Sequence, residues 1–137
     1  MLRPPLSVTI ITLNEEKNIA RAIQSVKGLA QEVLVVDSGS QDRTKEIARD
    51  LGARVLENPW PGYGQQKNFA QNQTTYDWVL NIDADEELSR ELALEIQNVL
   101  EKESDKSVKG YLLPRLSFYL GQWIRHGGWY PNRQLRL

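Results

Sequence analysis

Two aspartates, Asp83 and Asp85, follow an apolar, β-branched run that begins at Trp78. The run is typical of a buried strand, and the acids in positions 83–87 cannot continue it, because a buried carboxylate needs a partner or a metal. If the strand's alternation continues, both side chains point the same way, with about 6–7 Å between their Cα atoms. Paired carboxylates attract a hard divalent cation and leave positions for substrate phosphates. An acidic turn before a helix would also explain these residue types.

Strand and helix patterns alternate along the chain, which predicts an α/β fold with a mostly parallel sheet flanked by helices. Asn14 is placed to cap the first helix. The expected strands cover residues 6–11, 33–36, 54–57 and 78–82, and the expected helices cover residues 15–26, 43–51, 65–72 and 89–102. Ligands of such sheets bind outside the carboxyl ends of the strands. Polar residues crowd that edge: Thr12, Asn14, Glu15, Asp37 to Asp42, Asn58 and Asp83 to Glu87.

Each of these residues also has an ordinary structural explanation. Asp37 can accept hydrogen bonds from a base or ribose, or it can form an Asx turn. Glu15 alone is typical of a first-turn helix acid, and Asp42 and Thr44 are typical of capping and turn residues. Lys67 can balance a phosphate charge, but a lone lysine is more often simply solvated.

Composition excludes several other classes. The 137 residues include no cysteine and a single histidine, so disulfides, thiolate metal sites and histidine-rich zinc sites are excluded. The sequence has neither the GxGxxG nor the GxxxxGK[ST] phosphate-binding pattern. No apolar run reaches the length of a membrane-spanning helix, and no signal-peptide core is present, so we expect a cytoplasmic protein.

Four segments together resemble family 2 glycosyltransferases, which are inverting enzymes with the GT-A fold, a Rossmann-like fold of nucleotide-diphospho-sugar transferases. They are residues 8–15 (VTIITLNE), 35–44 (VVDSGSQDRT), 64–70 (GQQKNFA) and 81–88 (NIDADEEL). Residues 110–137 are further similar to the lipopolysaccharide core branch of that family.

The resemblance implies a role for each polar residue. Thr12, Asn14, Glu15 and Asp37 would bind the donor nucleotide, which we expect to be UDP-linked, and Lys67 stands where the family has a basic residue near it. Asp83 and Asp85 match the family's DXD motif, with Asp85 as the direct ligand of Mg²⁺ or Mn²⁺ and Asp83 as its neighbour or a ribose contact. The acceptor would be a saccharide or a lipid-linked molecule of bacterial surface polysaccharide or lipopolysaccharide core synthesis.

One part of the family's machinery is missing from this sequence. Inverting transfer needs a general base, and no carboxylate follows Asp105, so His126 is a weak candidate for that role. We therefore expect an N-terminal portion or an unusually short member. Residues 1–105 would form the nucleotide-sugar-binding core, and residues 106–137 would begin an acceptor-side segment of the same domain. A non-catalytic nucleotide-sugar-binding module is the alternative.

The charges are distributed unevenly along the chain. Residues 1–105 carry all 18 acids and 11 of the 17 basic residues, whereas residues 106–137 carry six bases and no acid. The basic, aromatic segment from Trp123 to Arg133 is expected to contact an acidic acceptor or an anionic membrane surface. Nucleic-acid binding is not expected, because the main body is negatively charged.

Overall fold

The computed structural model describes residues 3–102, 108–115, 117–119, 122–124 and 132–137. The chain divides into two compact units, Met1–Ser104 and Asp105–Leu137, and each is described by itself. Within the described ranges, every helix is too short or too polar to span a bilayer.

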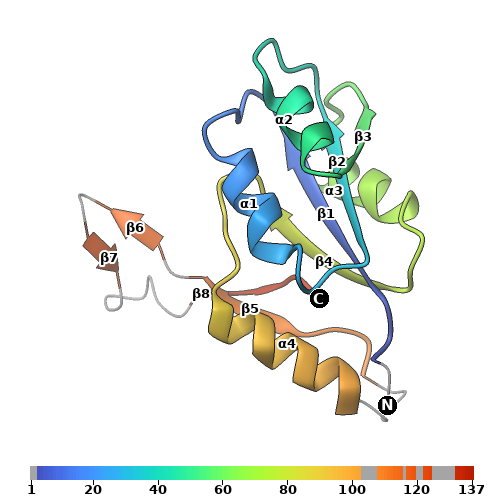
Figure 1. Ribbon diagram of the computed structural model, residues 1–137, viewed down its shortest axis with the longest axis vertical. Helices are drawn as coiled ribbons and strands as arrows, with labels where there is room; N and C mark the ends of the chain where they lie inside the picture. Colours follow the sequence, from blue (N-terminus) through green and yellow to red (C-terminus); the bar gives the residue numbers. More distant parts are fainter. Residues whose placement is uncertain (1–2, 103–107, 116, 120–121, 125–131) are drawn as a thin grey trace. The chain divides into compact units, whose positions relative to one another are not determined.

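A four-stranded parallel sheet forms the centre of the first unit (Figure 1). Its spatial order is β3-β2-β1-β4, from β1 (Leu6–Thr12), β2 (Glu32–Asp37), β3 (Arg54–Glu57) and β4 (Trp78–Asp83). All seven residues of β1 are buried, as expected for a central parallel strand covered on both faces. The mostly parallel α/β sheet predicted from the sequence is confirmed.

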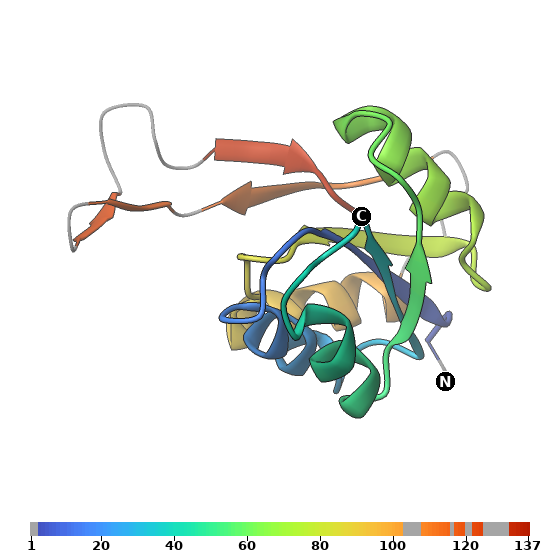
Figure 2. The same cartoon turned by 90° about the horizontal axis from the view of Figure 1, so that it is seen from above.

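The helices cover both faces of this sheet. They are α1 (Ile19–Val26), α2 (Thr44–Asp50), α3 (Tyr63–Asn72) and α4 (Arg90–Lys102). Figure 2 shows α3 on one face and α1, α2 and α4 on the other. The chain thus winds from β1 to β3 on one side, then crosses to the opposite edge through α3 to form β4. This reversal of winding direction creates a switch point between β1 and β4.

The core is built from the apolar stripes that the sequence periodicity predicts. On α1, the residues at helical spacing are all buried: Ile19, Ala22, Ile23 and Val26. On the other face, Ala70 of α3 packs in a cluster with Ile11, Leu34 and Val36 of the strands. The two layers hold the strand ends in a fixed arrangement.

The first helix begins at Ile19, four residues later than predicted from Asn14 as its cap. Asn14 adopts a left-handed backbone conformation, with φ of 52°, which asparagine tolerates better than most residues. Its side-chain oxygen accepts a hydrogen bond from the N–H of Gln41, at 2.8 Å, and so does not cap the helix. The prediction failed because this contact joins loops 27 residues apart.

Glu32 links residues at the edge of the sheet where the strands begin, opposite the edge formed by their carboxyl ends. Its carboxylate accepts hydrogen bonds from the Ser7 hydroxyl at 2.7 Å and from the N–H and hydroxyl of Thr75 at 2.9 and 2.7 Å. Arg54 lies 3.5 Å away. Burial raises the pKa of Glu32, but the hydrogen bonds from Thr75 and Ser7 and the charge of Arg54 outweigh burial, so the pKa is lowered.

Replacing Glu32 with glutamine should lower the free energy of unfolding at pH 7 by about 1–2 kcal/mol, because two hydroxyls and an N–H lose a charged acceptor. A carboxyl with a lowered pKa stabilises the fold above its usual pKa, and this contribution disappears as the pH falls through the lowered value. Urea unfolding across acidic pH should therefore show a smaller loss of stability for E32Q than for the wild type. E46Q, which alters an exposed pair with Arg43, should change little.

The second unit contains short antiparallel strands. β5 (Leu112–Arg115) pairs with β8 (Asn132–Leu135), and β6 (Ser117–Tyr119) pairs with β7 (Gln122–Ile124). The N–H of Tyr111 donates to the carbonyl of Leu137 at 2.7 Å, which closes the β5–β8 ladder. His126 lies outside the described residues, as do the side chains from Trp123 to Arg133, so their expected roles stay predictions.

Candidate functional site

The strand register places the polar residues predicted to bind ligand at one edge of the sheet. Thr12 pairs with Asp37 of β2, and Ile11, the residue before Thr12, pairs with Asp83 of β4. Asp37 in turn pairs with Glu57 of β3. The switch point between β1 and β4 therefore lies between Thr12 and Asp83, where ligands of such sheets bind.

Asp37 is fully buried, and its carboxylate is engaged by its own loop. Oδ2 accepts hydrogen bonds from the N–H groups of Gly39 and Ser40, at 2.9 and 2.7 Å, and Oδ1 accepts the Ser40 hydroxyl at 2.5 Å. Of the two roles that the sequence left open for Asp37, this is the turn-forming one. The carboxylate shapes the loop that follows β2.

Hydrogen bonds tie this β2–α2 loop to the β1–α1 loop. The Ser40 hydroxyl accepts from the N–H of Asn14 at 2.8 Å, and the Thr44 hydroxyl accepts from the N–H of Glu15 at 2.8 Å. The bond from Gln41 to Asn14 is a third contact between the two loops. Bonds from the N–H of Glu16 to Asp42 and from the N–H of Arg43 to the Glu16 carboxylate add two more. The buried Ser40, which the sequence did not single out, is the centre of this network.

Glu15 and Asp42 also accept hydrogen bonds. The carboxylate of Glu15 accepts a hydrogen bond from the Asn18 side chain at 2.9 Å. Asp42 accepts from the Thr44 hydroxyl and N–H and from the N–H of Glu16, and the Thr44 hydroxyl is the main reason that its pKa is lowered. The capping and turn roles expected for Asp42 and Thr44 agree with these contacts.

Thr12 presents a different situation. Thr12 is 5% exposed, and its hydroxyl oxygen has no hydrogen-bond partner among the described residues. An unsatisfied buried hydroxyl typically costs about 1–3 kcal/mol, so such a group requires an explanation. Its place at the switch point, next to Asp37, is where a ligand could supply the missing partner.

Asp83 and Asp85 are not arranged as strand alternation predicted. β4 ends at Asp83, and residues 83–86 form a turn in which the N–H of Glu86 donates to the Asp83 carbonyl at 3.0 Å. The Glu86 carboxylate accepts from the N–H of Asp83 at 2.7 Å, which fixes the turn from its other end. Asp85 is exposed at the tip. The acids end the strand, as predicted, but the turn and not the pleat positions Asp85.

Lys67 lies beside this turn. Its Nζ is 3.6 Å from Oδ1 of Asp83, and each side chain is about one-third exposed, at 33% and 34%. The expectation for a lone lysine was solvation, and the structure instead pairs it with the first acid of the motif. An ion pair therefore lies at the end of β4, two residues before Asp85.

The carboxylates Asp83 and Asp85 fit a hard divalent cation that is held in part by its substrate. The described residues contain no cluster of three or more histidine, cysteine or acidic side chains, so no preformed cage surrounds the position. Mg²⁺ is commonly held by one or two carboxylates together with substrate phosphates. Accessible Asp85 and half-buried Asp83 match that pattern.

Asn58, predicted at this edge, forms a further polar contact with Gln66, a residue that was not among the predicted site residues. Gln66 is fully buried, and its amide donates to the carbonyl of Asn58 at 3.2 Å and to the Ser38 hydroxyl at 3.3 Å. Asn58 donates back to Gln66 at 2.7 Å. A signal was present, since Gln66 and the buried Ala70 share the inward face of α3 at a spacing of four residues.

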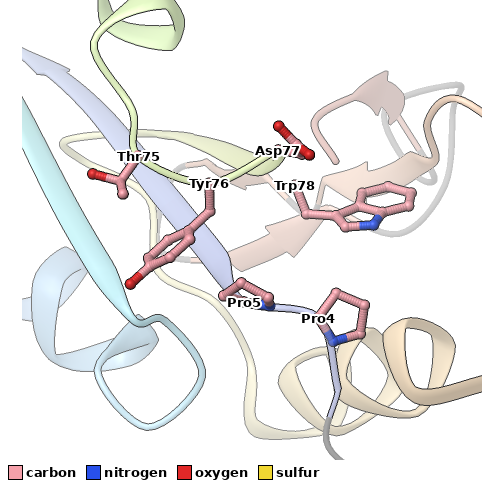
Figure 3. Close-up of a pocket in the computed structure, with 6 residues that line it drawn as sticks. All are labelled: Pro4, Pro5, Thr75, Tyr76, Asp77 and Trp78. Atoms are coloured by element: carbon pink, nitrogen blue, oxygen red, sulfur yellow. The ribbon is translucent and has the colours of Figure 1, made fainter.

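A shallow hollow of about 320 Å³ lies at the opposite edge (Figure 3). It is lined by Pro4, Pro5 and residues 75–78, with the rings of Tyr76 and Trp78 extending away from each other. Leu6 pairs with Trp78 at the start of the two strands. None of the predicted site residues lines this hollow.

Comparison with known proteins decides the family. Residues 7–127 match the family model described as Glycosyl transferase family 2. The chain belongs to this family. The family 2 chain is 50% identical over 116 residues to an uncharacterized glycosyltransferase of Rickettsia typhi, a match covering 85% of this chain and 40% of the relative. It is 38% identical over 138 residues to the lipopolysaccharide core biosynthesis glycosyltransferase LpsC of Rhizobium meliloti, covering 97% and 50%.

Solved structures of similar fold include glucosyl-3-phosphoglycerate synthase of Mycobacterium tuberculosis in complex with Mn²⁺, UDP and glucosyl-3-phosphoglycerate. That match has a TM-score of 0.54 and 34% identity, and it covers 59% of this family 2 chain and 33% of the other. The same synthase has been solved with Mg²⁺ and UDP, again with a TM-score of 0.54. The GT-A fold predicted from the motifs is confirmed. The chain spans half or less of the length of these curated relatives.

Proposed function

We propose that this chain carries the donor-binding part of an inverting glycosyltransferase that uses a nucleotide-diphospho-sugar, UDP-linked, and acts in bacterial surface polysaccharide or lipopolysaccharide core synthesis. The observation that carries the proposal is the strand register, which gathers Asp37, Thr12 and Asp83 at one switch point. The acceptor would be a saccharide or a lipid-linked molecule. Contact with an anionic membrane surface stays a prediction for the basic segment.

In this proposal the polar residues at the carboxyl edge of the sheet each have a role in binding the donor. The loop held by Asp37 and Ser40 provides a rigid wall for the base and ribose, with Asn14 and Glu15 on the adjoining loop. The Thr12 hydroxyl finds its hydrogen-bond partner on the nucleotide. Lys67 offsets the charge of the diphosphate beside Asp83.

Asp85 and Asp83 would hold Mg²⁺ or Mn²⁺ in the same arrangement. The metal supplies Lewis-acid stabilisation of the charge that builds on the leaving diphosphate. Support comes from the solved relative that holds Mn²⁺ together with UDP. The protein's own contribution is to orient the two carboxylates through the turn closed by Glu86.

A nucleotide-sugar-binding module without transfer activity is the second candidate. It is favoured by the hydrogen bonds that already occupy Asp37, Glu15 and Asp42 at this edge, because inverting transfer needs an available general base. Calorimetry with UDP and UDP-glucose, each with and without Mn²⁺, tests donor binding, which both candidates require. A turnover assay then separates them. Failure to bind either nucleotide would contradict both.

Replacing Thr12 with valine tests whether the unpartnered hydroxyl faces the nucleotide. Valine keeps the shape and removes a buried polar group that has no partner among the described residues. We expect the free energy of unfolding to stay constant or rise, while UDP affinity falls about tenfold, as for one lost hydrogen bond.

Thr9 provides a matched control in the same strand. Its buried hydroxyl accepts a hydrogen bond from the Asn81 side chain at 2.9 Å. T9V should therefore lower stability without changing UDP affinity, the reverse of T12V. Equal UDP affinity for T12V and the wild type would remove Thr12 from the binding site.

A further inference from the structure

Two large aromatic rings, Trp60 and Tyr63, are exposed where β3 joins α3. Trp60 is 48% and Tyr63 75% exposed. Their ring centroids are 4.8 Å apart and their planes meet at 89°. Edge-to-face packing of this kind is a favourable arrangement of aromatic rings. The two rings, here called the aromatic pair, thus present one joint apolar surface to solvent.

The backbone around the aromatic pair is restrained by its sequence. Pro59 and Pro61 stand on either side of Trp60, and each fixes its own φ angle. Gly62 has φ of 119°, a conformation that glycine adopts without steric cost. The carbonyl of Gly62 accepts the first hydrogen bond of α3, from Gln66 at 2.9 Å. The backbone that carries the aromatic pair is therefore restrained without any ligand.

Residues before and after the aromatic pair in the sequence are hydrogen-bonded to residues of the candidate site. Before it, the N–H of Asn58 donates to the carbonyl of Asp37 at 2.9 Å. After it, Gln66 reaches the Ser38 hydroxyl. Tyr63 and Lys67 are four residues apart on α3 and so share one helix face. Since Lys67 pairs with Asp83, Tyr63 lies one helical turn from that ion pair.

We propose that the aromatic pair is a platform for a pyranose ring. The proposal rests on the function proposed above, which places a nucleotide-sugar phosphate beside Lys67 and Asp83. A pyranose presents C–H groups on one face, and these are attracted to the electron-rich face of an aromatic ring. A protein partner would need an interface of about 800 Å² per side, far more than two rings provide.

The pyranose has two possible sources, the donor's sugar and the acceptor. Calorimetry of UDP against UDP-glucose, both with Mn²⁺, isolates the contribution of the donor sugar. Saturation-transfer NMR with methyl β-glucopyranoside, methyl β-galactopyranoside and methyl α-mannopyranoside, with and without UDP and Mn²⁺, detects binding of an acceptor-like ring. The ring protons of the bound face should receive the strongest transfer.

W60A and Y63A should weaken pyranose binding about three- to tenfold while changing UDP affinity less than twofold, because they remove ring contacts and leave the phosphate site. W60F and Y63F keep an aromatic face and should retain most of the binding. Loss of the advantage of UDP-glucose over UDP identifies the donor sugar as the occupant. Loss of methyl pyranoside transfer with that advantage intact identifies the acceptor.

L94A is the matched control, because Leu94 is also a large apolar side chain, 54% exposed, but lies on α4. It should leave every ligand unaffected. Unchanged pyranose binding in W60A and Y63A would overturn the proposal, as would a wild type that neither prefers UDP-glucose over UDP nor gives pyranoside transfer. An equal fall in UDP affinity would also overturn it, since the rings would then support the nucleotide. A wild type that binds no UDP contradicts the proposed function instead.

Discussion

Replacing Asp85 with alanine should remove the Mn²⁺-dependent part of UDP binding and should lower any donor turnover by about a hundredfold or more. An electrostatic contact preorganised for developing charge is typically worth about 3–4 kcal/mol. Asp85 is exposed at the tip of the turn, so its loss should leave the free energy of unfolding within about 0.5 kcal/mol of the wild type. Calorimetry in Mn²⁺ and in EDTA measures the metal-dependent part.

Glu87 is the control for this experiment, because it is another exposed acid in the same segment. E87A removes the same charge and should keep the metal dependence of UDP binding. D83A should lower affinity too, but it also leaves Lys67 without its 3.6 Å partner, so its effect is less specific. Equal metal dependence in D85A and the wild type would exclude Asp85 as a ligand.

Replacing Asp37 with asparagine should lower the free energy of unfolding by about 3 kcal/mol and abolish UDP binding. The buried carboxylate accepts two N–H groups and a hydroxyl, and hydrogen bonds to charged groups contribute about 1.5–3 kcal/mol each. An amide in its place has one acceptor oxygen and directs an NH₂ at a donor. Chemical denaturation gives the stability change, and calorimetry gives the binding.

S40A distinguishes the role of the loop's hydrogen bonds from that of the Asp37 carboxylate, because it leaves the carboxylate in place. It removes one bond to Asp37 and the acceptor for the N–H of Asn14, so a smaller loss of stability, about 1–2 kcal/mol, is expected. UDP affinity should fall in both variants. The fall should be larger for D37N, the variant that loses more stability. A stable D37N protein that binds UDP normally would mean that the loop does not depend on this network.

The fold was predictable because its signals are local and repeated. Period-two and continuous apolar runs marked the strands, and β3 was predicted with its observed bounds, Arg54–Glu57. Helical spacing marked the buried face of α1. Because parallel strands bring their carboxyl ends to one edge, the grouping of Thr12, Asp37 and Asp83 followed from the strand assignment alone.

Two of the details that failed depend on contacts between residues distant in the sequence, whereas the placement of Asp85 failed because of the local turn closed by Glu86. The start of α1 moved because Asn14 bonds to a loop 27 residues away, which no capping rule contains. The pairing of Lys67 with Asp83 joins two elements, so Lys67 alone could not reveal it. Asp37 was open between two roles because a turn-forming and a ligand-binding aspartate have the same local sequence.

The contacts between the β1–α1 and β2–α2 loops have a consequence for engineering. Asn14, Ser40 and Thr44 join them as donors and acceptors across the gap. A β1–α1 loop grafted from a homologue would lack the hydrogen-bond partners of the original β2–α2 loop, and the reverse also holds. The preference for a donor should therefore transfer only when both loops are exchanged together. Libraries that vary the two stretches jointly should yield more folded variants than libraries that vary either stretch alone.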